Sequence, residues 1–421
     1  MRRFSEIFLL ELKAVVRSKT LAMLTVASVA WMLAFPYVVR GDGTAEGARE
    51  IYVRYSLGGV FVLLAVALLA SATGSLARER AAKRLQLTLV RPVRYFTVAL
   101  GKIAALATVG AFVLAVAAAI LACRTDLSAR CNHAFSPLMP SPKEEAKAMY
   151  ADYMKDPDTP EAVKKAKPAV VLRLLAQKAV DRYETIPANT TYAWTFLTSN
   201  VKPQTPGVSL RLRFTNQYEM RQDVRGVFRI GGWEGVVSNV TQAVLTVPLA
   251  ASGPSDGEAA KLTFRNLGTS ALMLRPRRDL HLLVPADAFG WNLLRAWVEM
   301  VAVLTMIIAF GVFLSASLSR PVALFVAIVL LVVCEMSTSV LEQYPDSLET
   351  DTLDRIGLTL TRVAAEATHP ISELSPLEAL SRDECVETRD VIRTAAFDFI
   401  AIPVLMSLLS ALLLPRKQDD L

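Results

Sequence analysis

Six apolar blocks of about 20 residues constrain this 421-residue chain more than any other feature of its sequence. A helix of that length crosses roughly 30 Å of hydrocarbon, the thickness of a bilayer core. The chain is 53% hydrophobic with a mean hydropathy of +0.38, whereas about 45–50% of a soluble domain is apolar. Each block therefore predicts a membrane-spanning helix. The blocks are Thr20–Val39, Leu57–Ala77, Ile103–Cys123, Ala296–Leu318, Pro321–Leu341 and Ala395–Leu414.

Lysines and arginines in the connections predict the orientation of these spans, because basic residues concentrate in cytoplasmic loops. Five precede the first span and seven lie in residues 78–102, beside a single acid, Glu79. Residues 342–394 instead carry twelve acids and five arginines. We therefore expect an inner-membrane protein in contact with lipid, with both termini in the cytoplasm. The net charge of +7 then reflects topology and gives no indication of nucleic-acid binding.

This orientation divides the chain into three parts: a first membrane half (1–123), an extracytoplasmic domain (124–290) and a second membrane half (291–421) with an external acidic loop (342–394). Before the first span, residues 3–17 have the period of an amphipathic helix, which predicts either an interfacial helix or an extension of that span. The predicted fold is thus an all-α membrane domain of six spans with an inserted α+β domain.

Inside the inserted domain the spacing of apolar residues changes from a helical period to a period of two. Helical spacing occurs near Lys143–Lys155 and Pro168–Tyr183, and after Pro187 apolar residues alternate with polar ones in short runs. Seven such runs separated by turn residues predict an antiparallel β-sandwich. They are Tyr192–Phe196, Val208–Phe214, Val224–Ile230, Ala243–Leu249, Lys261–Arg265, Ala271–Arg275 and Leu280–Val284.

Cysteines and arginines outside the membrane leave alternatives open. An oxidising compartment permits a disulfide from Cys131 to Cys385 or to Cys123, and free buried thiols are the other interpretation. Four arginines fall on the outward phase of the predicted strands, where they form either a basic surface for an anionic partner or a solvated sheet face. They are Arg211, Arg213, Arg225 and Arg229.

Motifs for catalysis are absent from the sequence. There is no G-x-x-x-x-G-K-[ST] phosphate loop, and no G-x-S-x-G, H-E-x-x-H or C-x-x-C. The three histidines, His133, His281 and His369, lie far apart without a second ligand at useful spacing, which argues against a zinc site. We therefore predict a non-enzyme without catalytic, cofactor-binding or metal-binding residues.

The most informative segment lies between the second and third predicted spans. A charged pair opens it, leucines follow, and a Pro-Val and a Gly-Lys pair close it. These residues are Glu79-Arg80, Leu85, Leu89, Pro92-Val93 and Gly101-Lys102. Here the chain resembles the ABC-2 family of ABC-transporter permeases, although Lys83-Arg84 stands where the family often has a small pair. The resemblance covers residues 1–123 and 291–421 and excludes the extracytoplasmic domain.

The resemblance implies a permease subunit, with export as the expected direction, driven by a separate cytoplasmic ABC ATPase that binds the ATP. It also implies a second permease copy or paralogue. In the family this segment forms a coupling helix that docks on the ATPase, with charged residues for pairing and leucines for burial. The corresponding residues are Glu79, Arg80, Lys83, Arg84, Leu85 and Leu89. A loop that only fixes topology is the simpler interpretation, and a membrane-anchored receptor or scaffold is the alternative function.

Two acids fall inside predicted spans, Glu335 in the fifth and Asp398 in the sixth. Ionised carboxylates are costly in lipid, so both should face a protein interior. They either line a substrate or proton path or pair with Arg295 or Arg393 near the outer boundary. Arg295 and Glu299, four residues apart, could also pair on one helix face.

Overall fold

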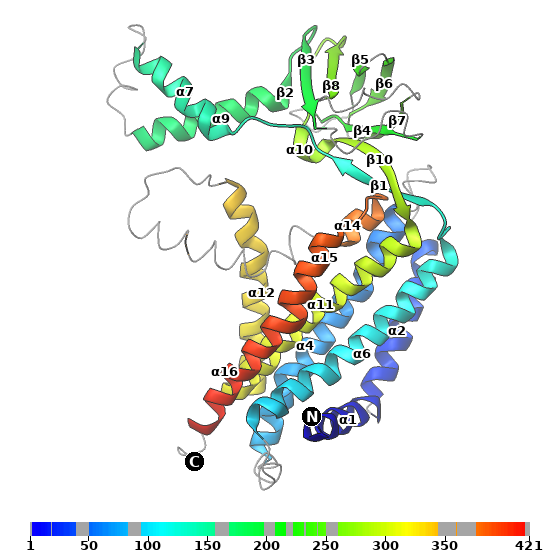
Figure 1. Cartoon of the computed structure of the whole chain (residues 1–421), viewed down its shortest axis with the longest axis vertical. Coiled ribbons are helices and arrows are strands. Elements are labelled where there is room, and N and C mark those ends of the chain that lie inside the picture. The colour runs from blue at the N-terminus through cyan, green and yellow to red at the C-terminus, as the bar shows by residue number, and fades with distance from the viewer. Residues whose placement is uncertain are drawn as a thin grey trace. The chain divides into compact units, whose positions relative to one another are not determined.

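The computed structural model describes residues 2–17, 19–38, 50–82, 94–155, 168–197, 207–215, 222–230, 233–241, 243–249, 260–343, 359 and 376–416 (Figure 1). The chain forms two compact units. The helical unit comprises Met1–Ala129, Ala288–Val340 and Thr361–Leu421, and the sheet unit comprises Arg130–Asp287 and Leu341–Leu360. All described strands belong to the sheet unit.

Four helices in the described part of the chain are long and apolar enough to cross a membrane, which marks the protein as a membrane protein. They coincide with the second, third, fourth and sixth predicted spans. They are Glu50–Ala81, which contains η1 (Val53–Leu57) and α4 (Gly58–Ala81); α6 (Tyr95–Arg124); α11 (Phe289–Ser317); and Thr388–Leu413, which runs through α15 (Thr388–Thr394), η2 (Ala395–Ala401) and α16 (Ile402–Arg416).

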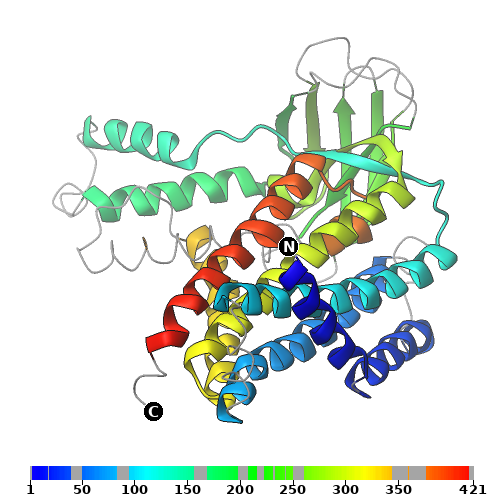
Figure 2. The same ribbon diagram turned by 60° about the horizontal axis from the view of Figure 1, so that its bottom comes forward.

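The predicted count of six spans is not reached in the described residues. α1 (Arg2–Arg17) and α2 (Lys19–Val38) qualify only as a pair bent by 62°, so five spans is the upper count. In α12 (Arg320–Gln343) the apolar stretch Arg320–Val333 is shorter than a span. The bend also excludes a straight extension of the first span, because α1 turns away from α2 and packs across α6 (Figure 2).

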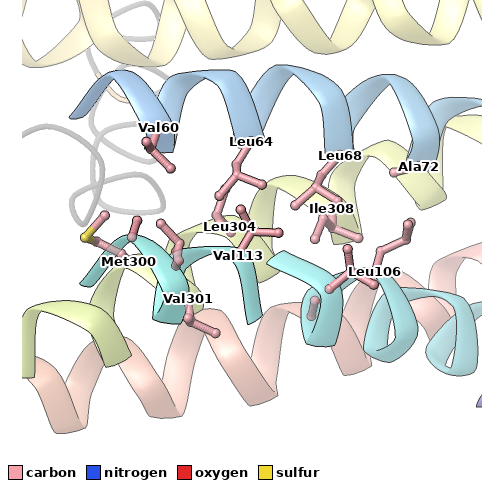
Figure 3. Packing of buried hydrophobic residues seen from close by; sticks show 14 of the residues in the cluster. Val60, Leu64, Leu68, Ala72, Leu106, Val113, Met300, Val301, Leu304 and Ile308 are labelled. Carbon is pink, nitrogen blue, oxygen red and sulfur yellow. The ribbon is translucent and has the colours of Figure 1, made fainter. Parts of the chain in front are cut away.

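α11 is the central helix of the helical unit. In its most apolar stretch of 18 residues, 78% of the residues are buried, whereas the corresponding share for the span Thr388–Leu413 is 22%. α11 packs on α4, α6 and α16. In Figure 3, Leu64 and Leu68 of α4 meet Leu304 and Ile308 of α11. Gly311 permits close approach, since a Cβ there would lie 2.8 Å from the Cβ of Ala72. Small residues have this role where membrane helices pack closely.

Two four-stranded sheets share one hydrophobic core in the sheet unit, in the orders β1-β10-β4-β7 and β3-β8-β5-β6. β5 lies antiparallel between β6 and β8, with Phe228 opposite Gly235 and Phe264. The strands are β1 (Arg130–Phe135), β3 (Thr191–Phe196), β4 (Ser209–Arg213), β5 (Asp223–Ile230), β6 (Trp233–Val240), β7 (Val244–Pro248), β8 (Ala260–Asn266) and β10 (Leu280–Ala288); a short pair is formed by β2 (Thr185–Ile186) and β9 (Leu272–Met273). All seven predicted strands are present, whereas β1, β2 and β6 were not predicted.

Two helices precede the larger part of the sheets, α7 (Pro142–Lys155) and α9 (Pro168–Glu184), and both match predicted helices. Ala146 of α7 and Val171 and Leu175 of α9 bury a small core of their own. Cys131 and Cys385 are each disulfide-bonded, while Cys123 is free and exposed. The pairing of Cys131 with Cys123 is therefore excluded. The fourth cysteine, Cys334, falls inside the fifth predicted span, and its side chain lies outside the described residues.

Candidate functional site

A buried lysine joins three helices where α4 ends and α6 begins. Lys102 lies in the second turn of α6, and its side chain is 3% exposed. Its Nζ is 2.5 Å from Oε1 of Glu11 on α1 and 2.7 Å from Oε1 of Glu79 on α4. A buried ammonium requires such partners, because the cost of removing it from water is large. We call Glu11, Glu79 and Lys102 the Lys102 cluster.

Arg80, which follows Glu79 on α4, contacts a fourth helix, α11. Arg80 donates hydrogen bonds through Nη1 to the carbonyl of Ala316 and through Nη2 to that of Leu318, the latter at 2.9 Å. The last carbonyls of a helix have no partner within the helix, so a guanidinium fork placed there stabilises its end. Adjacent residues of α4 therefore connect it to α1 and α6 on one side and to α11 on another.

Glu79 and Arg80 make contacts within the chain that the sequence did not predict. The sequence assigned both charges to a partner protein, whereas here Glu79 pairs with Lys102 and Arg80 binds α11. The predicted coupling residues Lys83, Arg84, Leu85 and Leu89 lie outside the described residues.

Glu11 and Lys102 are the residues of this site that sequence reasoning missed. Lys102 was noted as one of the seven basic residues of the connection and as half of a Gly-Lys pair, and Glu11 only as part of an amphipathic helix. A lysine directly at the start of an apolar block is a weak signal, because basic residues are common at the ends of spans; a buried one requires an anionic partner. Gly101 beside it brings α1 close, since a Cβ at this position would lie 2.8 Å from Cγ2 of Ile7.

Two further acids are buried in the helical unit. Glu299 on α11 and Asp398 on η2 are each 1% exposed. Both carboxylate oxygens of Glu299, and Oδ2 of Asp398, have no hydrogen-bond partner among the described residues. The pairing of Glu299 with Arg295 is thus not formed, and Oδ2 of Asp398 accepts from neither Arg295 nor Arg393. Glu335 belongs to α12, and its side chain lies outside the described residues.

The four arginines of the sheet unit do not share one surface. Arg211 and Arg213 lie on β4, while Arg225 and Arg229 lie on β5 of the other sheet. Arg229 pairs with Glu234 at 2.7 Å, and both side chains are exposed. An exposed pair of this kind contributes about 0–1 kcal/mol. The alternative of a single basic surface built from these four residues is therefore wrong.

No group of three or more His, Cys, Asp or Glu side chains suited to a metal ion occurs within the residues that the structure describes. Two charged features of the described part of the helical unit are candidates for function: the Lys102 cluster with Arg80, and the carboxyl pair Glu299 and Asp398. No known protein family, curated protein or solved structure matches the chain.

Proposed function

We propose that this chain is the permease subunit of an ABC-2-like transporter that exports a substrate and is driven by a separate ATPase. The proposed fold is a six-span membrane domain, with α2 and α12 as the additional spans, into which an extracytoplasmic α+β domain with a β-sandwich is inserted. The proposed location is the inner membrane, with both termini in the cytoplasm. The resemblance between residues 79 and 102 and the family supports this proposal, as do the four apolar helices.

The contacts at the end of α4 are the observation on which the proposal rests most. Glu79 and Arg80 lie at the start of residues 78–89, the segment expected to dock on the ATPase. Ionic and bidentate contacts lead from these two residues to α1, α6 and α11. A displacement of the docking segment would therefore reach the buried centre of the helical unit through short side-chain contacts.

Two groups of residues then divide the coupling between them. Lys83, Arg84, Leu85 and Leu89 dock on the ATPase, while Glu79 and Arg80 transmit its movement to the spans. ATP is bound by the partner, since this sequence has no phosphate loop. A second permease copy or paralogue completes the complex. This chain is accordingly a non-enzyme without a cofactor of its own.

Copurification with a candidate ATPase tests this division. The double reversal Lys83→Glu with Arg84→Glu should release the ATPase, because it places acids where the partner meets bases. Glu79→Gln should leave the ATPase bound and reduce the ATP hydrolysis that accompanies transport. The reversal Arg416→Glu with Lys417→Glu, which changes the same charges in the C-terminal tail, is the matched control.

Retention of the ATPase by the Lys83 and Arg84 reversal would show that the segment does not dock. A reporter fused after residue 90 tests the orientation separately. A reporter signal from the periplasm would show that the topology is the reverse of the proposed one. If no ATPase copurifies and the extracytoplasmic domain alone captures an envelope component, the receptor or scaffold function replaces the transporter.

A further inference from the structure

Glu299 and Asp398 form a polar site remote from the Lys102 cluster. Glu299 precedes Ala316 by 17 residues on α11, which corresponds to about 25 Å along a helix. Asp398 lies on η2, which packs against α11, and it interacts electrostatically with Glu299. η2 is a π-helical segment, and such segments occur frequently at functional sites. The two acids thus lie on two elements that pack against each other, α11 and the span Thr388–Leu413.

The basic residues nearest to these acids in sequence are Arg295 on α11 and Arg389 and Arg393 on α15, and none of them donates a hydrogen bond to Oε1 or Oε2 of Glu299 or to Oδ2 of Asp398. The other group that interacts electrostatically with Glu299 is also an acid, Asp390 on α15. α14 (Pro376–Ser381) carries Glu378, whose partner is Arg382. The remaining packed helices, α4, α6 and α16, carry charges only near their ends. These are Arg78, Glu79 and Arg80 on α4, Lys102 and Arg124 on α6, and Arg416 on α16.

Burial without a partner decides the chemical state of the pair. An ionised carboxylate in a protein interior costs several kilocalories per mole unless a cation or donors surround it. Both oxygens of Glu299 and one of Asp398 have no hydrogen-bond partner in the described part of the chain, and both residues are 1% exposed. A neutral carboxylic acid avoids the cost of the charge. The packed arrangement therefore favours the protonated form of each residue.

We propose that Glu299 and Asp398 are a proton-binding pair whose occupancy is linked to the packing of η2 against α11. Both carboxyl groups hold a proton while the two helices are in contact. When η2 moves away and water reaches the site, each O–H bond breaks, the proton passes to water and the electron pair stays on the carboxylate. Repulsion between the two carboxylates then opposes repacking until protons rebind. This proposal does not depend on nucleotide or on an ATPase.

Infrared spectroscopy of the full chain in lipid nanodiscs tests the pair directly. At neutral pH the wild type should show the C=O stretching band of protonated carboxylic acids. Glu299→Gln and Asp398→Asn should each remove part of this band, and the double variant should remove both parts. Glu387→Gln, which changes an exposed acid immediately before the same span, is the matched control and should leave the band intact.

A wild-type spectrum without this band at neutral pH would overturn the proposal, as would a band that survives the double variant. Loss of the band on adding Na⁺ at fixed pH would also overturn it, by assigning the site to a metal cation. Glu299→Asp covers the case in which the amide variants do not fold, because it keeps the acid and should shift the band. ATPase copurification is independent of these spectra, so either proposal can fail alone.

Discussion

Replacement of Lys102 by Met is expected to destabilise the helical unit by about 2–4 kcal/mol. The substitution removes two ionic hydrogen bonds, each worth about 1.5–3 kcal/mol. The side chains of Glu11 and Glu79 are 20% and 30% exposed, so water can solvate them once the lysine is gone. That solvation keeps the cost below the sum of the two bonds.

Removal of the two acids should cost more than removal of the lysine. Glu11→Gln with Glu79→Gln leaves an ammonium group with a side-chain exposure of 3% and no counter-charge, a situation that costs about 3–5 kcal/mol. Each single variant keeps one anion beside Lys102. The loss of unfolding free energy in the double variant should therefore exceed the sum of the losses in the two single variants by about 1 kcal/mol. This is within the range measured for residues in one network.

Denaturant unfolding in detergent micelles, followed by the fluorescence of the five tryptophans, measures these free energies. Hydrogen exchange reports the local effect, because the cluster holds α1 on α6 and exchange should rise in α1 before it rises in α11. Strictly additive single variants would refute the network. A larger loss for Lys102→Met than for the double variant would refute the argument from exposure.

Three further predictions concern other contacts. Arg80→Lys keeps the charge but loses the guanidinium fork that binds two carbonyls, so the free energy of unfolding should fall by about 1–2 kcal/mol. Hydrogen exchange at the end of α11 should become faster, and unchanged exchange would contradict the contact. Gly226→Ala places a Cβ 2.4 Å from the ring of Phe264, so the sheet unit should lose about 1–3 kcal/mol, seen as a lower thermal midpoint; an unaltered midpoint would mean that the ring moves freely. Burial and the hydrogen bond that Tyr183 donates to Glu145 raise the pKa of the tyrosine to about 12, so its contribution to stability is complete below its ordinary pKa of 10 and is lost as pH rises toward 12. An ultraviolet difference titration against Glu145→Gln should show the tyrosine ionising at lower pH in the variant, and coincident curves would exclude the interaction.

Strict alternation of apolar and polar residues along the strands made much of the sheet unit predictable. Val224, Phe228 and Ile230 of β5 point into the core at period two, and the same holds for Leu262 and Phe264 of β8. β6 and β1 lack that pattern. In β6 the neighbours Val236 and Val237 are both apolar, although Val236 is 79% exposed. Hydrophobicity therefore does not indicate which residues of this strand face the core.

Long-range contacts explain what the sequence could not predict in the helical unit. Glu11 and Lys102 are 91 residues apart, and Arg80 and Ala316 are 236 apart. A local charge pattern cannot distinguish a side chain that meets a partner protein from one that meets a distant helix of its own chain. Composition likewise gave the apolar blocks, but the bend between α1 and α2 depends on how α1 packs against α6.

The two charged features are connected through α11, and this connection limits where movement can occur. α11 runs for 29 residues without a proline, is largely buried, and binds Arg80 near its end. The span that packs on it contains the π-helical turn η2 followed by Pro403, and both features are places where helices bend. A displacement that Arg80 transmits should therefore move α11 as a rod, and the contact between α11 and η2 should absorb the difference. Because Glu299 and Asp398 lie at that contact, their protonation would report a movement that begins about 25 Å away.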